Sequence, residues 1–523
     1  GHERFTLDAI LKEEAAVLGL VDARKDRAWL WVKEEDTAGL SADQKRAVHN
    51  IGRSPWLVQP LPAPAGAGKT TSMRALRAAV HRRFDGAVLV LAPTGKAVDV
   101  AVREGAGDQG YTIAKALQLL RDNQLELGPH TLVVVDEAAM VGTGDLRHLL
   151  TATTTAGAKT VLVGDAHQLA PVKARGGMFA QLCTDLPWTQ HLSQVWRMRD
   201  PDERAASLAL RNGGPAAARR AIGWYRTHDR LHCGDQITMA TDALTAYRAD
   251  TAAGKDALLI CDTTEMADAL NQRIHHDTID ADAPTTTGAR GHRLAVGDLI
   301  LTRHNDASIP LRNTDDPAAE HSPVRNGQRW QVTAINAKNS RLAARRLEDN
   351  TLGVFFNDYV REHITYGYTV TVHCAQGVTA DTTHAVLSET ATRALSYVAM
   401  TRGRHTNTAY FYQRTPEHEY RDESTRAGHI SSRGSSQHAT RLLRAIIAND
   451  EHLITAHGLA AATAQSLPPQ VQSAIEHRAV AISQRAAQYQ RWRAAAAAVE
   501  DATAEAHSRD IARDRSIDGG LEL

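Results

Sequence analysis

Residues 63–71 read Ala63-Pro64-Ala65-Gly66-Ala67-Gly68-Lys69-Thr70-Thr71, and this stretch decides the fold. An apolar run ends at Val58 before it, and a helix-forming run begins at Ser72 after it. Strand, glycine-rich turn and helix form a phosphate-binding loop, in which backbone N–H groups and a helix N-terminus face a phosphate. The motif assigns Lys69 to the β- and γ-phosphates and Thr70 to Mg²⁺. We therefore expect ATP and Mg²⁺ as cofactors, with nucleotide contacts from Ala65, Gly66, Ala67, Gly68, Lys69, Thr70 and Thr71.

One position departs from the G-x-x-x-x-G-K-[ST] pattern, because Ala63 stands where the first glycine is expected. If this position needed a left-handed backbone, alanine would cost about 1–2 kcal/mol. Gly66 and Gly68 remain, so we expect a working loop. The alternative is an Ala/Gly-rich turn that carries an unrelated lysine.

The composition is typical of soluble globular domains. The chain has 523 residues, 43% of them hydrophobic, which is enough for several domains. Lys and Arg together number 60, as do Asp and Glu, so bulk charge does not indicate a nucleic-acid partner. The four cysteines lie far apart, and no signal peptide or membrane-spanning run is visible. We expect a cytoplasmic protein without membrane insertion, and Gly1-His2 suggests a fragment of a longer chain.

A second apolar strand ends in two carboxylates. Residues Leu132–Val135 are all aliphatic, and Asp136 and Glu137 follow them directly. Nucleotide hydrolysis commonly uses one acid near Mg²⁺ and one near the attacking water. We assign Asp136 to the metal and Glu137 to water activation. The alternative is a solvated turn after a strand.

Two glutamines complete the candidate site. Gln44 lies in a predicted helix that begins after Ser41, where its amide could bind the edge of adenine; the alternative is a solvated helical residue. Gln168 follows the apolar run Thr160–Val163. A glutamine there can contact both the γ-phosphate and a bound polymer, so we predict that Gln168 couples the two.

These segments occur in the order of the superfamily 1 helicase motifs, at Leu40–Val48, Ala65–Thr71, Ala92–Ala97, Val135–Val141 and Gly164–Val172. The runs VVVDEAAMV and GDAHQLAPV resemble the RecD-like branch, superfamily 1B. The segments ERFTLDAILKEEAAVL and LSADQKRAV are most similar to the helicase region of F-type conjugative relaxases. The resemblance covers roughly residues 3–412.

The resemblance implies an α/β fold with two RecA-like parallel-sheet P-loop lobes, a small SH3-like β-barrel insertion and a helical C-terminal tail. The expected divisions are a helical segment at 1–40; lobe 1A at 41–195, with a short pin-like insertion near 119–131; lobe 2A at 196–290 plus 361–415; the barrel at 291–360; a linker at 416–437; and the helical tail at 438–523.

The resemblance also implies further site residues. Arg197 lies in a segment like motif IV and Arg402 in one like motif VI, so both are expected to reach the γ-phosphate from the second lobe. Gly377, in a segment like motif V, is expected to contact the nucleotide. An isolated arginine is more often a surface ion pair, which is the alternative here. The candidates for DNA contact are Pro93, Thr94, Thr112, His167, Thr371 and His373.

The expected function is ATP-dependent DNA unwinding and 5′-to-3′ translocation on single-stranded DNA, within a conjugative relaxase. The expected partners are single-stranded and tailed duplex DNA and conjugative transfer proteins. The open alternatives are a degenerate DNA-binding module, a RecD-like repair helicase and an RNA-directed helicase. A relaxase nicking domain needs a three-histidine metal site, which this sequence lacks, so DNA nicking is not expected. Arg491-Trp492-Arg493 is interpreted as an amphipathic helix face rather than a base-stacking site.

Overall fold

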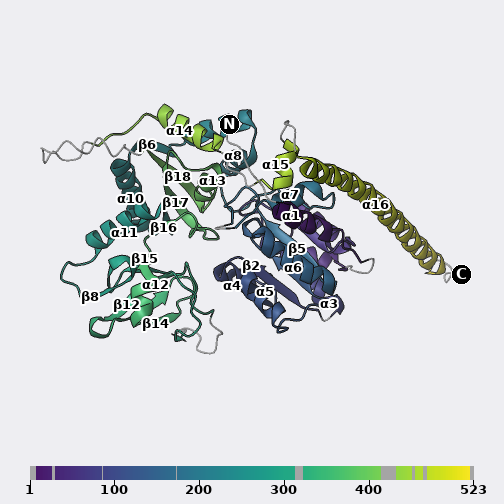
Figure 1. Cartoon of the computed structure of the whole chain (residues 1–523), viewed down its shortest axis with the longest axis horizontal. Helices are drawn as coiled ribbons and strands as arrows, with labels where there is room; N and C mark the ends of the chain where they lie inside the picture. The colour runs from purple at the N-terminus through teal and green to yellow at the C-terminus, as the bar shows by residue number, and fades with distance from the viewer. Residues whose placement is uncertain are drawn as a thin grey trace.

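The computed structural model describes residues 8–25, 30–84, 86–171, 174–312, 322–413, 431–449, 454–462 and 468–518, without the side chains of 83, 84 and 499–518. Two parallel sheets form two lobes, and a smaller antiparallel barrel lies beside the second lobe (Figure 1). The expected fold class, with two P-loop-type lobes, an SH3-like barrel and a helical tail, is confirmed.

The sheet of the first lobe has the strand order β1-β5-β4-β2-β3, and every pairing in it is parallel. Its central strands are aliphatic and buried, as parallel strands covered on both faces must be. Pro60 and Pro62 are tolerated because β1 is an edge strand. The strands are β1 (Val58–Pro62), β2 (Val88–Ala92), β3 (Gln109–Thr112), β4 (Leu132–Val135) and β5 (Lys159–Gly164).

The helices of this lobe are α1 (Asp8–Leu20), α2 (Ala42–Arg53), α3 (Lys69–Phe84), α4 (Gly95–Arg103), α5 (Ile113–Arg121), α6 (Thr143–Ala156) and α7 (Met178–Asp185), with short 3₁₀ helices at Glu34–Thr37 and Ala138–Met140. The predicted start of α2 is confirmed, since Ser41 and Gln44 form a capping box. Of the helical segment expected at 1–40, the described residues show α1 and the 3₁₀ turn at Glu34–Thr37, with non-helical chain between them.

The pin-like insertion expected near residues 119–131 corresponds to the end of α5 and the segment that follows it. Arg121 ends α5, and the described segment 122–131 contains turns but no strand. Leu125 and Leu127 pack against the hydrophobic core of the first lobe. The physical reason is that these two leucines bury apolar surface, which holds the segment against the lobe.

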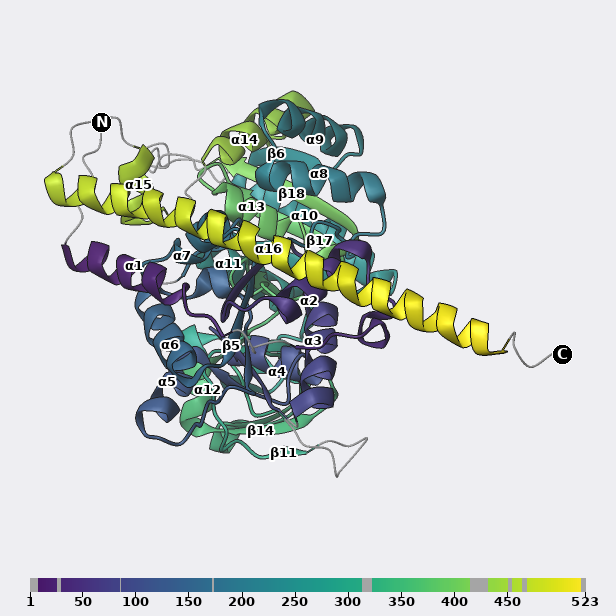
Figure 2. The same ribbon diagram turned by 90° about the vertical axis from the view of Figure 1, so that its right-hand side faces the viewer.

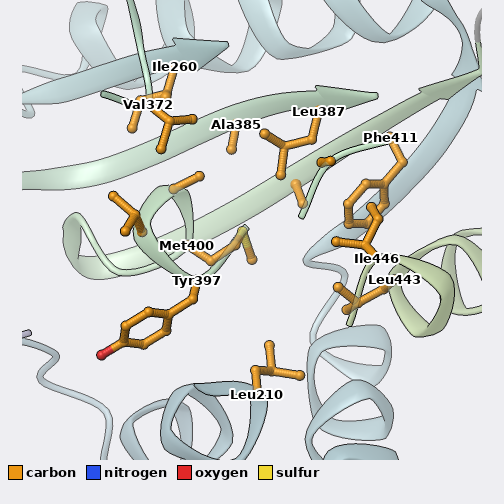
Figure 3. Packing of buried hydrophobic residues seen from close by; sticks show 14 of the residues in the cluster. Leu210, Ile260, Val372, Ala385, Leu387, Tyr397, Met400, Phe411, Leu443 and Ile446 are labelled. Carbon is orange, nitrogen blue, oxygen red and sulfur yellow. The ribbon is translucent and has the colours of Figure 1, made fainter. Parts of the chain in front are cut away.

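The sheet of the second lobe has the strand order β16-β7-β17-β18-β6 and is also entirely parallel. Its strands are β6 (Leu231–Asp235), β7 (Ala257–Cys261), β16 (Thr369–Thr371), β17 (Ala380–Ser388) and β18 (Gly403–Gln413). The helices are α8 (Pro201–Asn212), α9 (Pro215–Thr227), α10 (Gln236–Ala252), α11 (Thr264–Thr278) and α13 (Arg393–Ala399). On one face, Ile260, Leu387 and Phe411 of the sheet share a core with Tyr397 and Met400 (Figure 3).

The barrel between β7 and β16 in sequence is antiparallel, with the order β11-β14-β13-β12-β10-β15. Asn326-Gly327 forms a turn before β12, in which Gly327 has a φ of +86°. The barrel strands are β10 (Leu299–Thr302), β11 (Leu311–Arg312), β12 (Arg329–Asn336), β13 (Arg341–Arg346), β14 (Leu352–Phe356) and β15 (Ile364–Tyr366). The associated elements are α12 (Asn357–His363), the hairpin β8 (Thr285–Thr287) and β9 (Arg293–Ala295), and 3₁₀ turns at Ala289–Gly291 and Ala337–Asn339.

The C-terminal region forms α14 (Ser436–Ala448), α15 (Ala456–Ala462) and α16 (Pro469–Asp518). Of the expected linker, 416–430 lies outside the described residues, whereas Arg433 bridges to Gly234 of β6. Helix α14 packs on the second lobe, while α16 runs across the molecule and extends beyond its body (Figure 2). No helix among the described residues combines the length and the apolar character needed to cross a bilayer.

Candidate nucleotide-binding site

The loop between β1 and α3 has the geometry that its sequence predicts. Gly66 and Gly68 have φ values of +79° and +74°, and a Cβ on Gly66 would collide with Arg197. Ala63 does not have a positive φ, and its N–H donates to the Gly164 carbonyl at 2.8 Å. Because its backbone is not left-handed, alanine carries none of the strain that the departure from glycine could have caused.

Lys69 begins α3 and lies between the two acids that follow β4. Its Nζ is 3.3 Å from Glu137 Oε1 and 3.7 Å from Asp136 Oδ1. Burial disfavours the charged amine, but Glu137 and Asp136 outweigh burial and raise the pKa of Lys69. Burial raises the pKa of Asp136, since the neighbouring Lys69 only partly opposes it. In the structure the lysine therefore pairs with both acids.

Glu137 has a left-handed backbone, with φ 50° and ψ 41°. Such a conformation is uncommon for a non-glycine residue and is often found at functional sites. Its N–H donates to Asp136 Oδ1 at 2.9 Å, so the two acids are fixed relative to each other. Its Oε2 accepts a hydrogen bond at 3.4 Å from Gln376, which belongs to the second lobe.

Thr70 and Asp136 are the candidate Mg²⁺ ligands. A hollow of about 10 Å³ is lined by Lys69, Thr70 and Asp136 together with apolar side chains. This volume is about enough for one water molecule. Hydroxyl and carboxylate oxygens are the donors that Mg²⁺ prefers. The residues therefore fit the ion. Among the described residues, no three His, Cys, Asp or Glu side chains are grouped so that they could hold a metal.

The second lobe brings two arginines to the loop. The Trp196 N–H donates to the Gly66 carbonyl at 2.8 Å, which places Arg197 against the loop, and Arg197 Nη1 donates to the Thr401 carbonyl at 3.0 Å. Arg402 is buried, and it donates to the Val398 carbonyl at 2.9 Å and to Thr401 Oγ1 at 3.0 Å. Both arginines interact electrostatically with Glu137.

The charges of these arginines lack a direct counter-ion. Among the residues that the structure describes, neither Arg197 nor Arg402 has a carboxylate within ion-pair distance. Burial and the nearby Arg197 lower the pKa of Arg402 to about 9, and burial lowers the pKa of Arg197. A bound anion would relieve both effects, so the pair is well placed for a phosphate.

Gln44 contacts the loop itself. Its Nε2 donates to the Ala67 carbonyl at 3.1 Å and the Gly68 carbonyl at 3.4 Å, and its Oε1 accepts from the Ser41 N–H. The alternative of a solvated glutamine is excluded, because Gln44 is buried. In this conformation, both ends of its amide group are occupied by protein groups.

Gln168 and Gln376 meet across the lobes. Gln376 Nε2 is 3.3 Å from Gln168 Oε1 and 3.4 Å from Glu137 Oε2, while the Oε1 of Gln376 is buried without a hydrogen-bond partner among the described residues. The predicted Gly377 follows with φ +78° and is exposed. The structure thus brings Lys69, Glu137, Gln168, Arg197 and Arg402 to the interface between the two lobes.

The candidates for DNA contact fall into two groups. Pro93, Thr94 and Thr112 lie at the carboxyl ends of the neighbouring strands β2 and β3, where Thr94 and Thr112 cap α4 and α5. His373 and Gln168 instead line a cavity of about 390 Å³ between the lobes, to which Thr94 and Thr112 do not contribute. Thr371 ends β16, two residues before His373, and the His167 N–H donates to Asp165.

Four residues near the site were given no role from the sequence. Asp165 lies within the motif segment Gly164–Val172 and Tyr397 lies shortly before Arg402, but residue type alone does not show that they contact each other at 3.2 Å. Trp196 is 55% exposed beside the loop, and its neighbour Arg197 was the only signal for it. Arg211 lies on α8 and pairs with the buried Asp165 at 2.6 Å. No sequence pattern identifies this arginine.

Comparison with known proteins agrees with this architecture. Residues 39–236 match a family described as an AAA domain, and residues 286–365 match the Rv2311 SH3-like barrel domain. Protein Rv2311 of Mycobacterium tuberculosis (strain ATCC 25618 / H37Rv) is 55% identical over 121 residues, which are 23% of this chain and 68% of that protein. The SH3-like barrel expected at 291–360 therefore has a counterpart in sequence as well as in the structure.

Two further relatives cover most of the chain. A probable conjugal transfer protein TraA of Sinorhizobium fredii is 28% identical over 387 residues, 72% of this chain and 33% of TraA. The ATP-dependent RecD2 DNA helicase of Deinococcus radiodurans is 27% identical over 434 residues, 77% of this chain and 54% of RecD2. This chain therefore spans about a third of the first protein and about half of the second.

Among solved structures, a Pif1 helicase from Bacteroides in complex with ADP-AlF3 and ssDNA is similar at a TM-score of 0.46 and 16% identity, covering 71% of this chain and 92% of that one. The AAA-domain match and the TraA and RecD2 relatives agree with the motif order and with the converging lobes. The chain is similar to the superfamily 1B, RecD-like helicases and to the conjugative relaxases.

Proposed function

We propose that this chain is an ATP-driven DNA helicase that moves 5′-to-3′ along single-stranded DNA, as the helicase part of a conjugative relaxase. One observation carries the proposal: both lobes contribute to one site, where Lys69 and Glu137 face Arg197, Arg402 and Gln376. A site divided between two lobes changes whenever the lobes move relative to each other, so ATP turnover and lobe movement are coupled.

The roles follow from the geometry. Lys69 would leave the acids and bind the β- and γ-phosphates, which would free Glu137 to orient the attacking water. Mg²⁺, held through Thr70 and Asp136, would neutralise phosphate charge. Arg197 and Arg402 would stabilise the charge that develops on the γ-phosphate; such arginines are worth roughly 10³–10⁵ in rate where they have been measured. The remaining nucleotide contacts are proposed for Gln44, residues 65–71 and Gly377.

Trp196 is a further candidate for nucleotide binding. Its side chain is 55% exposed although its backbone is fixed to Gly66. A large exposed ring held beside a phosphate loop can stack on a base, with an effect of about 1–3 kcal/mol. We propose that Trp196 binds the adenine and that Gln44 joins it once its amide leaves the Ala67 and Gly68 carbonyls.

DNA would lie across both lobes, where the cavity lined by His373 and Gln168 would hold part of the strand. RecD2 is named a DNA helicase, which supports DNA rather than RNA as the polymer. The TraA relatives support a role in conjugal transfer and, with it, conjugative transfer proteins as partners. The polarity is proposed from the family resemblance.

ATP hydrolysis with and without oligo(dT) tests the motor. We expect single-stranded DNA to stimulate turnover, Lys69→Ala to abolish it, and Arg402→Lys to lower kcat by about 10³. Lys33→Ala, which changes an exposed lysine of the same lobe, serves as the matched control. Tight DNA binding without nucleotide binding would instead identify a degenerate DNA-binding module.

Strand displacement on duplexes with 5′ or 3′ tails tests polarity. Unwinding of the 5′-tailed duplex alone is expected, and unwinding of the 3′-tailed duplex alone would refute the proposed direction. RNA-tailed substrates in the same assay test an RNA-directed activity. A RecD-like repair role is distinguished from a relaxase role by which full-length proteins the chain co-purifies with in its native cell.

A further inference from the structure

Tyr397 joins the two lobes through its hydroxyl group. The residue lies on α13 of the second lobe, and its ring is buried in the core that also contains Leu210 and Met400. Figure 3 shows that the hydroxyl points away from the labelled residues of that core. The ring therefore stabilises the second lobe, and the hydroxyl is available for contacts outside it.

Both contacts of this hydroxyl are with the first lobe. Its oxygen accepts a hydrogen bond from the Ala65 N–H at 3.3 Å, and its O–H donates to Asp165 Oδ2 at 3.2 Å. Burial and the adjacent Asp165 carboxylate raise the pKa of Tyr397, so the hydroxyl stays protonated and can donate. One oxygen atom thus connects the phosphate loop with the segment that follows β5.

Asp165 is held mainly by the second lobe. It is fully buried, and Arg211 of α8 donates to its two oxygens at 2.6 to 3.1 Å. A buried carboxylate needs such compensation, because an unpaired charge in the interior is costly. The same carboxylate accepts from the His167 N–H, and Gln168 Nε2 lies 3.5 Å from it.

These contacts place Tyr397 between the segment proposed to bind DNA and the loop proposed to bind ATP. Gln168 lines the interlobe cavity with His373, and Ala65 belongs to the phosphate loop. Tyr397 also lies near the end of α13, and Arg402 follows shortly after this helix ends at Ala399. A rotation of the second lobe that moves Arg402 relative to the nucleotide must therefore move the Tyr397 hydroxyl relative to Ala65 and Asp165.

We propose that Tyr397, with Arg211, is a positioning residue through which DNA bound at the 165–168 segment stimulates ATP hydrolysis at the phosphate loop. This inference rests on the proposed function. Tyr397 touches neither reactant. It fixes the position of the phosphate loop relative to the Asp165–Gln168 segment. The closed arrangement of the lobes is then also the one in which Glu137 and the arginines are aligned.

The chain offers a matched pair of substitutions. Tyr397→Phe removes the hydroxyl and keeps the ring in the core. Tyr225→Phe is the control, because Tyr225 is fully buried in the same core and its hydroxyl has no hydrogen-bond partner among the described residues. Each variant loses one hydroxyl group from the same hydrophobic cluster, but only Tyr397→Phe also loses hydrogen bonds between the lobes.

Hydrogen exchange tests the contact whether or not the chain hydrolyses ATP. We expect Tyr397→Phe to speed exchange in peptides that cover 63–68 and 165–171 by about tenfold, since a hydrogen bond to a buried charge is lost, while Tyr225→Phe leaves both peptides unchanged. Equal exchange in the wild type and Tyr397→Phe would overturn the proposal.

Steady-state kinetics tests the coupling. We expect the ratio of kcat with oligo(dT) to kcat without it to fall about tenfold in Tyr397→Phe, with the affinity for labelled oligo(dT) and the KM for ATP within about twofold of the wild type. Arg211→Gln should lower the same ratio. An equal loss of basal and stimulated kcat, or an unchanged ratio, would contradict the inference. A wild-type protein without any ATPase would contradict the proposed function instead.

Discussion

At the scale of the residue, Asp43 shows how one carboxylate can build part of a site that it does not touch. Its Oδ2 accepts the N–H groups of Ser193 at 2.9 Å and Gln194 at 3.1 Å, just before Trp196. Burial alone would raise the pKa of Asp43, but the hydrogen bonds from Ser41 and from these backbone groups lower it to about 2. Asp43 therefore fixes the segment that brings Trp196 and Arg197 to the phosphate loop.

The substitution Asp43→Asn tests this anchor. An amide has one acceptor oxygen where the carboxylate has two, so we expect a loss of roughly 1–3 kcal/mol of stability at pH 7. The folded pKa lies below the unfolded one, so this stabilisation is present above about pH 4 and disappears as the pH falls through about 2. Urea unfolding at pH 7 and pH 3 measures it, with the exposed Asp282→Asn as the control. A difference that persists unchanged at pH 3 would show that the charge is irrelevant.

At the scale of the element, α16 is held to the first lobe along one face. Arg478, Arg485, Tyr489 and Trp492 are spaced by seven, four and three residues, which places them on one side of a helix. Arg478 pairs with Asp185 at 2.8 Å, and Arg485 pairs with Asp22 at 2.7 Å. This face explains how a helix whose apolar residues are mostly alanines docks on the first lobe.

The aromatic end of this face should carry much of the docking energy. Trp492 lies edge-on to Trp56 at 5.7 Å, and Trp56 stacks on Trp188 at 4.4 Å. We expect Trp492→Ala to cost about 1–3 kcal/mol of docking energy and to speed hydrogen exchange in residues 475–495. Val480→Ala, on an exposed position of α16, is the control. Equal protection in both variants would mean that the two ion pairs suffice.

At the scale of the whole molecule, the barrel is also fastened to the first lobe. Arg325 donates to both oxygens of Asp99 on α4, at 2.8 and 3.1 Å. Lys96 of the same helix donates to the Gly327 carbonyl at 3.2 Å and pairs with Glu348. Because α4 starts directly after Pro93 and Thr94, this contact links the barrel to the carboxyl edge of the first sheet.

The charge pairing at this contact should depend on salt. Partly exposed pairs are worth roughly 0.2–1 kcal/mol and are screened as ionic strength rises. We expect Arg325→Ala to speed hydrogen exchange of residues 322–328 at low salt and to have less effect at 1 M salt, where screening is strong. The double exchange Asp99→Arg with Arg325→Asp should restore protection, whereas Arg341→Ala, elsewhere on the barrel, should not change it. Failure of the double exchange to restore protection would rule out a charge-based contact.

The sequence by itself determined the strands, the phosphate loop and the acids, because aliphatic runs, glycines and strand-ending carboxylates act through local backbone geometry. It also identified both arginines, through motif order. It did not determine how residues 119–131 pack, since the sequence does not indicate which residues a leucine in a loop will contact.

Only the tertiary structure decided what joins the lobes. Tyr397, Asp165 and Arg211 lie 46 to 232 residues apart in pairs, and their contacts depend on how two sheets are oriented, which no local pattern encodes. The same holds for the harmless Ala63, whose backbone conformation is set by its bond to Gly164. Local chemistry fixed the parts of the site, and packing between distant segments fixed their arrangement.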